Sequence, residues 1–132
     1  MQVSPWILLV GLAGGFIIFR IAASKLSGVT QVSAATAEEL ISQQDAVVLD
    51  VRTHDEYSAG RIPKARHVPL SQINARLKEL DKYRGRSIIV SCRSGARSAR
   101  ACKVLKKNGF EDVYNLKGGI RSWARARHTI ES

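Results

Sequence analysis

Three short apolar runs recur along the chain, and they limit its fold more than any other feature. Residues 46–51, 87–91 and 113–116 are each only a few positions long, and Asp50 is the one charged residue among them. Runs of this kind are typical of strands that are covered on both faces. Segments with helical spacing separate them, so we predict an α/β fold with a mainly parallel central sheet flanked by helices.

Capping and turn signals predict the elements between these strands. A pattern that resembles a capping box at residues 36–39 predicts a helix ending near Gln44. Ser71 is expected to cap another helix, in which Ile73, Leu77 and Leu80 form one buried stripe. The remaining expected elements are a short helix at 53–59 closed by Gly60, a brief strand at 67–68, a helix terminated by Asn108 and Gly109, and a closing helix that contains Trp123.

The N-terminal segment is apolar over a length that just suffices to span a bilayer. Every residue from position 6 to position 19 is apolar or glycine, and Arg20 and Lys25 follow. Positive charge on this side predicts that the domain stays in the cytoplasm. We expect residues 1–25 to be a single-pass transmembrane anchor, with a cleaved signal peptide or a surface-lying helix as alternatives. Gly11 and Gly15 have the spacing that would let two such helices pair as a homodimer.

The rest of the chain has room for one domain and carries an excess of positive charge. Residues 26–32 are expected to form a linker and the first strand, and residues 33–132 the domain itself. The net charge of +10 favours anionic partners, among them lipid headgroups and small anions. Only Tyr83 among the aromatic residues lies near a basic cluster, which disfavours nucleic acid. The two cysteines make no disulfide framework, and the three histidines share no metal-ligand spacing.

The polar loop that follows the second apolar run carries the chemistry. Cys92 stands where a strand gives way to a helix, which is where open parallel sheets bind ligands. Gly95 lets the loop turn so that several amides can face an anion, and Arg93 and Arg97 add positive charge. These groups favour the thiolate, so we expect a lowered pKa and an ionised sulfur that faces solvent. The alternative, a small buried hydrophobic cysteine, fits Cys102 better, with a resolving thiol as the second interpretation of Cys102.

Five groups of residues follow one another along the chain: Asp-Val-Arg at 50–52, Gly-Arg-Ile-Pro-Lys-Ala at 60–65, the loop at 92–98, Gly-Phe at 109–110, and Leu-Lys-Gly-Gly-Ile at 116–120 with Trp123. Together they resemble the rhodanese family of single-domain sulfurtransferases over residues 29–123. The resemblance implies a rhodanese-like fold, no cofactor, and a thiosulfate sulfurtransferase activity. In that reaction a cysteine persulfide carries sulfur from an anionic donor to cyanide or to a thiol, either a small molecule or a thioredoxin-like protein.

The resemblance assigns roles to individual residues of this chain. Cys92 is the catalytic nucleophile, and the donor-binding residues are Arg93, Ser94, Gly95, Ala96 and Arg97. Asp50 and Arg52 support the site from the end of the neighbouring strand. Their support is either an ion pair that steadies the loop or a contact with substrate.

Two features qualify the resemblance. Relatives usually have histidine and glycine where this chain has Arg61 and Lys64, and the added charge could alter the choice of partner. Four residues separate Cys92 from Arg97, whereas cysteine phosphatases have five before their arginine, so the shorter loop disfavours a phosphate ester. A membrane-tethered sulfur carrier or docking module without catalysis is the other hypothesis.

Overall fold

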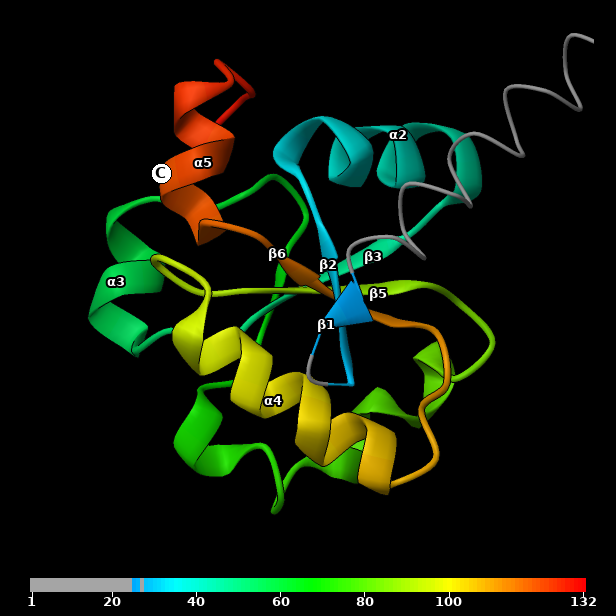
Figure 1. The fold of residues 1–132 in the computed structure, drawn as a ribbon. Helices are drawn as coiled ribbons and strands as arrows, with labels where there is room; N and C mark the ends of the chain where they lie inside the picture. The colour runs from blue at the N-terminus through cyan, green and yellow to red at the C-terminus, as the bar shows by residue number, and fades with distance from the viewer. Residues whose placement is uncertain (1–24, 27) are drawn as a thin grey trace, which may run out of the picture.

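The computed structural model describes residues 25–26 and 28–132, and it confirms the predicted α/β architecture (Figure 1). Six strands form one sheet in the order β1-β2-β6-β5-β3-β4. All neighbouring strands are parallel except β1 and β2, which pair antiparallel at one edge. The strands are β1 (Lys25–Leu26), β2 (Val29–Val32), β3 (Val47–Asp50), β4 (Arg66–His67), β5 (Ile88–Ser91) and β6 (Val113–Leu116).

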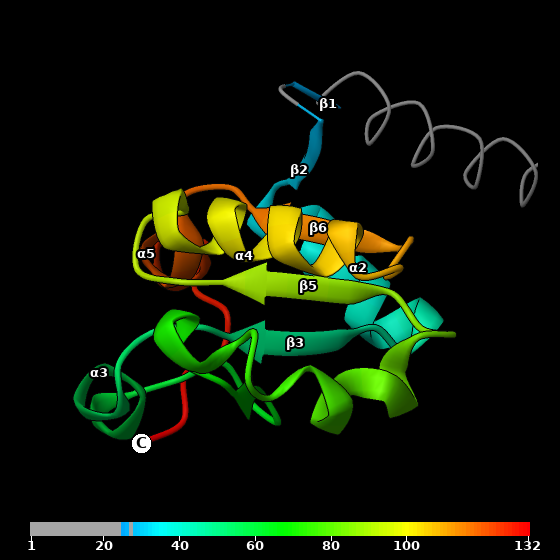
Figure 2. The ribbon, with the colours of Figure 1, turned by 90° about the horizontal axis from the view of Figure 1, so that it is seen from below.

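Helices cover both faces of this sheet and enclose two apolar cores. Helices α2 (Ala34–Gln44) and α5 (Gly119–Arg125) lie together over one face, where Leu40 and Trp123 are buried. Helix α4 (Ala96–Lys107) lies over the other face with two 3-10 segments, and Leu105 and Leu80 are buried there (Figure 2). Strands β3 and β5 are buried along their whole length, as their apolar sequences predicted.

Two helices begin with side-chain caps, one of them earlier than predicted. Helix α3 (His54–Ala59) has the full capping box, in which Thr53 and Glu56 each accept a bond from the backbone of the other. Helix α2 begins at Ala34 and not at residue 36, because the hydroxyl of Ser33 accepts the Thr36 amide at 3.1 Å. The predicted start was therefore wrong by about half a turn.

The predicted helix after Ser71 was wrong in type but right in its buried stripe. Residues Leu70–Gln72 and Leu77–Tyr83 form two 3-10 segments, and Ser71 lies inside the first of them without capping it. Ile73 and Leu80 are nevertheless buried, and Leu77 packs against the same core. Leu77, Leu80 and Tyr83 are three residues apart, a spacing that serves a 3-10 helix as well as an α-helix, so the apolar pattern could not separate the two.

The predicted membrane anchor at residues 1–25 falls almost entirely outside the described residues. Within residues 25–26 and 28–132, no helix combines the length and the apolar character that a bilayer span requires.

Candidate active site

The loop that carries Cys92 connects β5 to α4 and is held against the start of α5. Strand β5 ends at Ser91, the loop turns at Gly95, and α4 begins at Ala96. Gly95 has a φ of 109°, a conformation that glycine adopts without steric cost. The Cys92 carbonyl accepts the amide of Ile120 at 2.8 Å, and the Arg93 carbonyl accepts the amide of Arg121 at 3.3 Å. The backbone carbonyls of Cys92 and Arg93 are therefore fixed to α5.

Hydrogen-bond donors from the loop and from α4 surround the Cys92 sulfur. The Gly95 amide lies 3.1 Å from Sγ, and the Ser98 hydroxyl oxygen lies 3.3 Å from it. Burial by itself raises the pKa of the Cys92 thiol. The Ser98 hydroxyl and the amides of Ser98, Gly95 and Ser94 outweigh that effect and lower the pKa below its ordinary value. The predicted lowering of the pKa is confirmed in direction, and of the predicted cradle of amides at 93–97 the Gly95 amide bonds to the sulfur.

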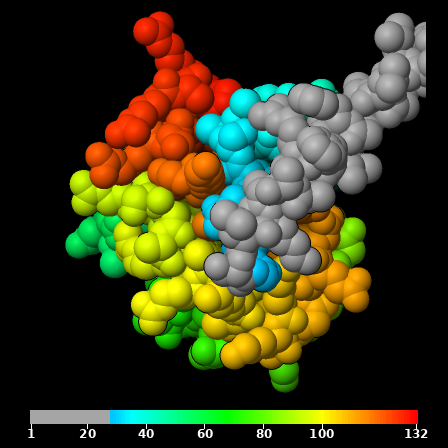
Figure 3. Space-filling view, in the orientation of Figure 1, coloured from blue at the N-terminus to red at the C-terminus, as the bar shows by residue number. Residues whose placement is uncertain are grey.

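The predicted exposure of this sulfur was wrong. Cys92 as a residue is only 1% exposed, because the loop closes over it and Ser98 covers it from α4. Arg93, Ser94 and Ala96 are exposed around it, whereas Gly95 is buried. Figure 3 shows the side chains of α4, in yellow, spread over the surface in this view. Access to the sulfur is therefore restricted, which favours small reacting groups.

Arg97 forms an ion pair that the sequence did not reveal. Its two terminal nitrogens contact the carboxylate of Glu56 on α3 at 2.7 and 2.9 Å, and both side chains are about one-third exposed. The guanidinium lowers the pKa of Glu56 to about 2, and hydrogen bonding to Glu56 raises the pKa of Arg97. Glu56 therefore partly balances the charge of Arg97.

Asp50 and Arg52 form an ion pair, as predicted, and that this pair steadies the loop at 92–98 stays a prediction. Arg52 donates to both carboxylate oxygens of Asp50, with the shortest contact at 2.7 Å, and both residues are buried. Its Nη2 also donates to the Gly60 carbonyl at 2.6 Å, so the pair braces the turn after α3. A direct contact with substrate stays a prediction.

Ser98 and Asn115 are two site residues that the sequence analysis missed. Ser98 is fully buried on α4, and its hydroxyl also donates toward Asn115 Oδ1. Asn115 is 2% exposed on β6 and donates to the Gly95 carbonyl at 3.2 Å. The available signal was an amide side chain inside a buried strand, where asparagine is disfavoured without a specific partner.

Cys102 is the packed core residue that was expected. It is fully buried on α4, and burial raises the pKa of its thiol to about 12. The thiol therefore stays neutral and unreactive at pH 7.

The two departures from the family pattern have local structural consequences. Lys64 has a φ of 63°, so a lysine occupies a left-handed position that suits the usual glycine. The Arg61 guanidinium lies 4.8 Å from the centre of the Tyr57 ring, and the Arg61 backbone pairs with Glu131 in the C-terminal tail.

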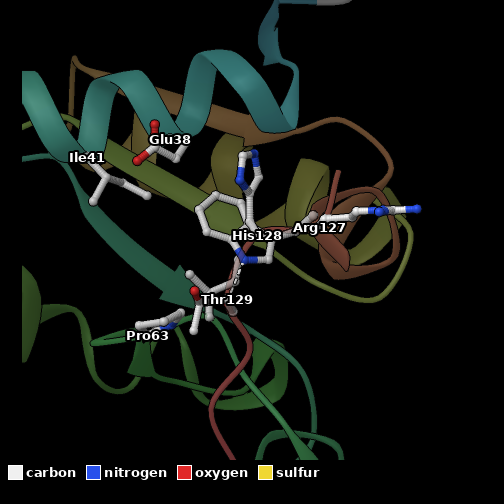
Figure 4. Close-up of a pocket in the computed structure, with 8 residues that line it drawn as sticks. Glu38, Ile41, Pro63, Arg127, His128 and Thr129 are labelled. Carbon is white, nitrogen blue, oxygen red and sulfur yellow. Dashed lines mark hydrogen bonds between the residues drawn. The ribbon is translucent and has the colours of Figure 1, made fainter. Parts of the chain in front are cut away.

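A cavity of about 320 Å³ lies apart from the cysteine loop, between α2 and the C-terminal tail (Figure 4). The indole nitrogen of Trp123 donates to the Thr129 carbonyl in its wall. None of residues 92–98 lines it, so it is no part of the cysteine site. The residues that line the cavity are Glu38, Ile41, Ile62, Pro63, Trp123, Arg127, His128 and Thr129.

Within the described part of the chain, no three His, Cys, Asp or Glu side chains gather as metal ligands.

The fold and this site define a class: single-domain α/β proteins with an activated cysteine in a strand-to-helix loop. The sequence model of the Rhodanese-like domain matches residues 33–126, and the chain belongs to that family. The chain is 40% identical over 93 residues to a sulfurtransferase of Allochromatium vinosum, covering 70% of this chain and 85% of the relative. It is 36% identical over 95 residues to the thiosulfate sulfurtransferase GlpE of Pseudoalteromonas translucida, covering 72% and 89%.

A solved structure supports the same assignment. The crystal structure of a rhodanese-related protein from Thermoplasma volcanium superposes with a TM-score of 0.70 at 31% identity. The match covers 76% of this chain and 96% of that one. The resemblance to the rhodanese family is thus confirmed, and sulfur transfer is the general chemistry that it supports.

Proposed function

We propose that this protein is a thiosulfate sulfurtransferase that carries sulfur as a persulfide on Cys92. In the first half-reaction the Cys92 thiolate attacks the outer sulfur of thiosulfate. A bond forms between Sγ and that sulfur, the S–S bond of thiosulfate breaks, and sulfite leaves with the electron pair. In the second, a thiolate or cyanide attacks the terminal sulfur of the persulfide, and Cys92 leaves again as the thiolate. No external oxidant or reductant is needed.

The observation that carries this proposal is the presence of two hydrogen-bond donors on the Cys92 sulfur. The Gly95 amide and the Ser98 hydroxyl lie within 3.3 Å of Sγ and favour an anionic sulfur. A thiolate is both the nucleophile of the first half-reaction and the leaving group of the second. The same donors therefore assist both steps.

The burial of Cys92 favours a small donor over a bulky one. Thiosulfate and other small anionic sulfur compounds suit a sulfur with so little exposed surface, and the exposed Arg93, next to Cys92 in the chain, would attract their charge. Arg97 contributes less charge, because Glu56 pairs with it. The acceptor is a small thiol or a thioredoxin-like protein that presents its thiol on a protruding loop.

We also propose, from the sequence of residues 1–25 alone, that a single membrane helix tethers the domain on the cytoplasmic side. Gly11 and Gly15 would allow this helix to form a homodimer contact. A reporter fused to the C-terminus tests the topology, since we expect activity from a reporter that works only in the cytoplasm. Activity from a reporter that requires export would refute the orientation.

Mass spectrometry of the protein after thiosulfate treatment tests the central proposal. We expect the mass of one sulfur atom to appear on Cys92, to be lost on addition of a thiol, and to be absent in Cys92→Ser. Steady-state turnover with a thiol acceptor then separates an enzyme from a carrier, because a carrier would load sulfur without turnover. A protein that gains no sulfur on Cys92 would be a docking module, and the proposal would be wrong.

A further inference from the structure

Asn115 is a buried amide that points from the central sheet toward the catalytic loop. It lies on β6, whose other inward-facing residues are apolar, and it is 2% exposed. Its Nδ2 donates to the Gly95 carbonyl at 3.2 Å and to Gln31 Oε1 at 3.0 Å. Because the Gly95 carbonyl can only accept, the amide cannot turn over, and Oδ1 must face Ser98.

Ser98 has one hydroxyl hydrogen and three acceptors within reach. Its oxygen lies 2.5 Å from Asn115 Oδ1, 3.2 Å from the Gly95 carbonyl and 3.3 Å from Cys92 Sγ. The closest acceptor is Asn115, so a neutral Cys92 leaves the hydroxyl directed at the amide. A negative sulfur is a stronger acceptor than an amide oxygen and turns the hydroxyl toward itself. Asn115 Oδ1 then loses the hydrogen bond from the Ser98 hydroxyl.

We propose that Asn115 is a positioning residue that competes with Cys92 for the single Ser98 hydroxyl hydrogen, and so sets how readily the sulfur becomes and stays anionic. This inference deepens the proposed function, because Sγ carries charge both as the attacking thiolate and as the group that leaves the persulfide. The hydroxyl turns toward Sγ at these two moments and back toward Asn115 when Sγ is neutral. No proton is transferred in this motion.

The loop itself does not depend on Asn115. The Gly95 carbonyl also accepts the Ala99 amide at 3.1 Å, and the Cys92 carbonyl is held by the Ile120 amide. A substitution at position 115 leaves in place the other titratable side chains on the elements that surround Cys92. They are Arg93, Arg97 with Glu56, Asp50 with Arg52, His67 and Cys102.

Asn115→Leu removes the competing acceptor at similar volume. The test measures the thiolate of Cys92 by ultraviolet absorbance against pH, in a Cys102→Ala background that leaves one thiol. We expect the thiolate fraction below the titration midpoint to rise about fivefold, because Ser98 then donates to sulfur without competition. In a Ser98→Ala background the same substitution should change this fraction by less than about twofold.

Asn115→Asp should act in the opposite direction. Its carboxylate holds the Ser98 hydrogen more strongly and adds a negative charge, so the thiolate fraction should fall several-fold. Ser87→Ala is the matched control, since it removes a hydroxyl bond to Asp112 at the far end of β5 and should leave the titration of Cys92 in place.

The inference is overturned if Asn115→Leu leaves the thiolate fraction unchanged or lowers it, or if its effect persists in full without Ser98. If Asn115→Leu does not fold, nuclear magnetic resonance of the Asn115 side-chain amide, recorded against pH in the otherwise native protein, tests the inference instead. The amide resonances should shift at the pH where Cys92 ionises and should not shift in Ser98→Ala, and equal shifts in both would refute the competition. These measurements need no sulfur donor. The competition for the Ser98 hydrogen can therefore be refuted while sulfur transfer is observed, and sulfur transfer can be refuted while the competition is observed.

Discussion

Gly119 touches the backbone of the loop that carries Cys92, so Gly119→Ala tests how this loop is held. A Cβ at this position would lie 2.4 Å from the Cys92 carbonyl oxygen and 2.6 Å from the carbonyl carbon and oxygen of Arg93. Contacts below 3.0 Å essentially never occur, and all three neighbours are backbone atoms. The loop must therefore retreat by at least about half an ångström, because no side chain can swing aside.

The cost of this change follows from three contributions. A left-handed alanine at a φ of 60° costs about 1–2 kcal/mol, and the smaller entropy of the unfolded alanine chain offsets about half of that. Retreat of the loop weakens the bonds from Ile120 to Cys92 and from Arg121 to Arg93, at about 1 kcal/mol each. We expect a loss of about 3 kcal/mol in the free energy of unfolding, measured by urea denaturation, together with a large loss of sulfur transfer.

Gly28→Ala is the matched control. Gly28 has a φ of 77°, yet no heavy atom of the described residues lies within 4 Å of an added Cβ, so only the conformational cost of about 1 kcal/mol applies. Sulfur transfer should be unaffected there. Equal losses of stability in the two variants, or a normal transfer rate in Gly119→Ala, would refute the reasoning.

Three further predictions concern other residues of the domain. Arg97 depresses the pKa of Glu56 to about 2, so the pair stabilises the fold above about pH 4.5, and this contribution is lost as the pH falls toward 2. Glu56→Gln should lower the free energy of unfolding by about 1 kcal/mol at pH 7, a value that already allows for solvent screening. It should also weaken the dependence of that free energy on pH as the pH falls from about 4.5 toward 2, and an unchanged pH dependence would contradict this prediction. Cys102→Ala should leave sulfur loading intact, and native wild-type protein should be alkylated once and unfolded protein twice; loss of loading would revive a resolving role. Lys64→Gly should raise the free energy of unfolding by about 0.5–1 kcal/mol, and a loss would show that the lysine is not strained.

The fold was predictable wherever local sequence decides local structure. Strands β3 and β5 are short apolar runs buried on both faces, and α3 carries both halves of its capping box within four residues. The 3-10 segment Leu77–Tyr83 was not predictable in type, since its spacing of apolar residues also suits an α-helix. Which backbone bonds form there depends on packing against the sheet.

The candidate site was predictable only as far as the loop sequence reaches. The amides around Cys92 follow from a loop between a strand and a helix, but the partners of that loop come from distant segments. Glu56 is 41 positions from Arg97, and Asn115 is 17 positions from Ser98. Only the strand order, which places β5 between β3 and β6, brings these side chains together. The burial of Cys92 has the same origin, because polar neighbours in sequence do not reveal a loop that closes over the sulfur.

The titration of Cys92 in the folded Cys102→Ala protein tests the account most directly. The alkylation rate and the thiolate absorbance, followed together against pH, should share one midpoint below the ordinary value for a cysteine. The reason is that the Ser98 hydroxyl and the nearby backbone amides lower the pKa by more than burial raises it. Ser98→Ala should move that midpoint upward. A thiol that titrates at or above the ordinary value, and that stays inert to small alkylating reagents at pH 7, would contradict the claim that this loop holds a reactive anionic sulfur.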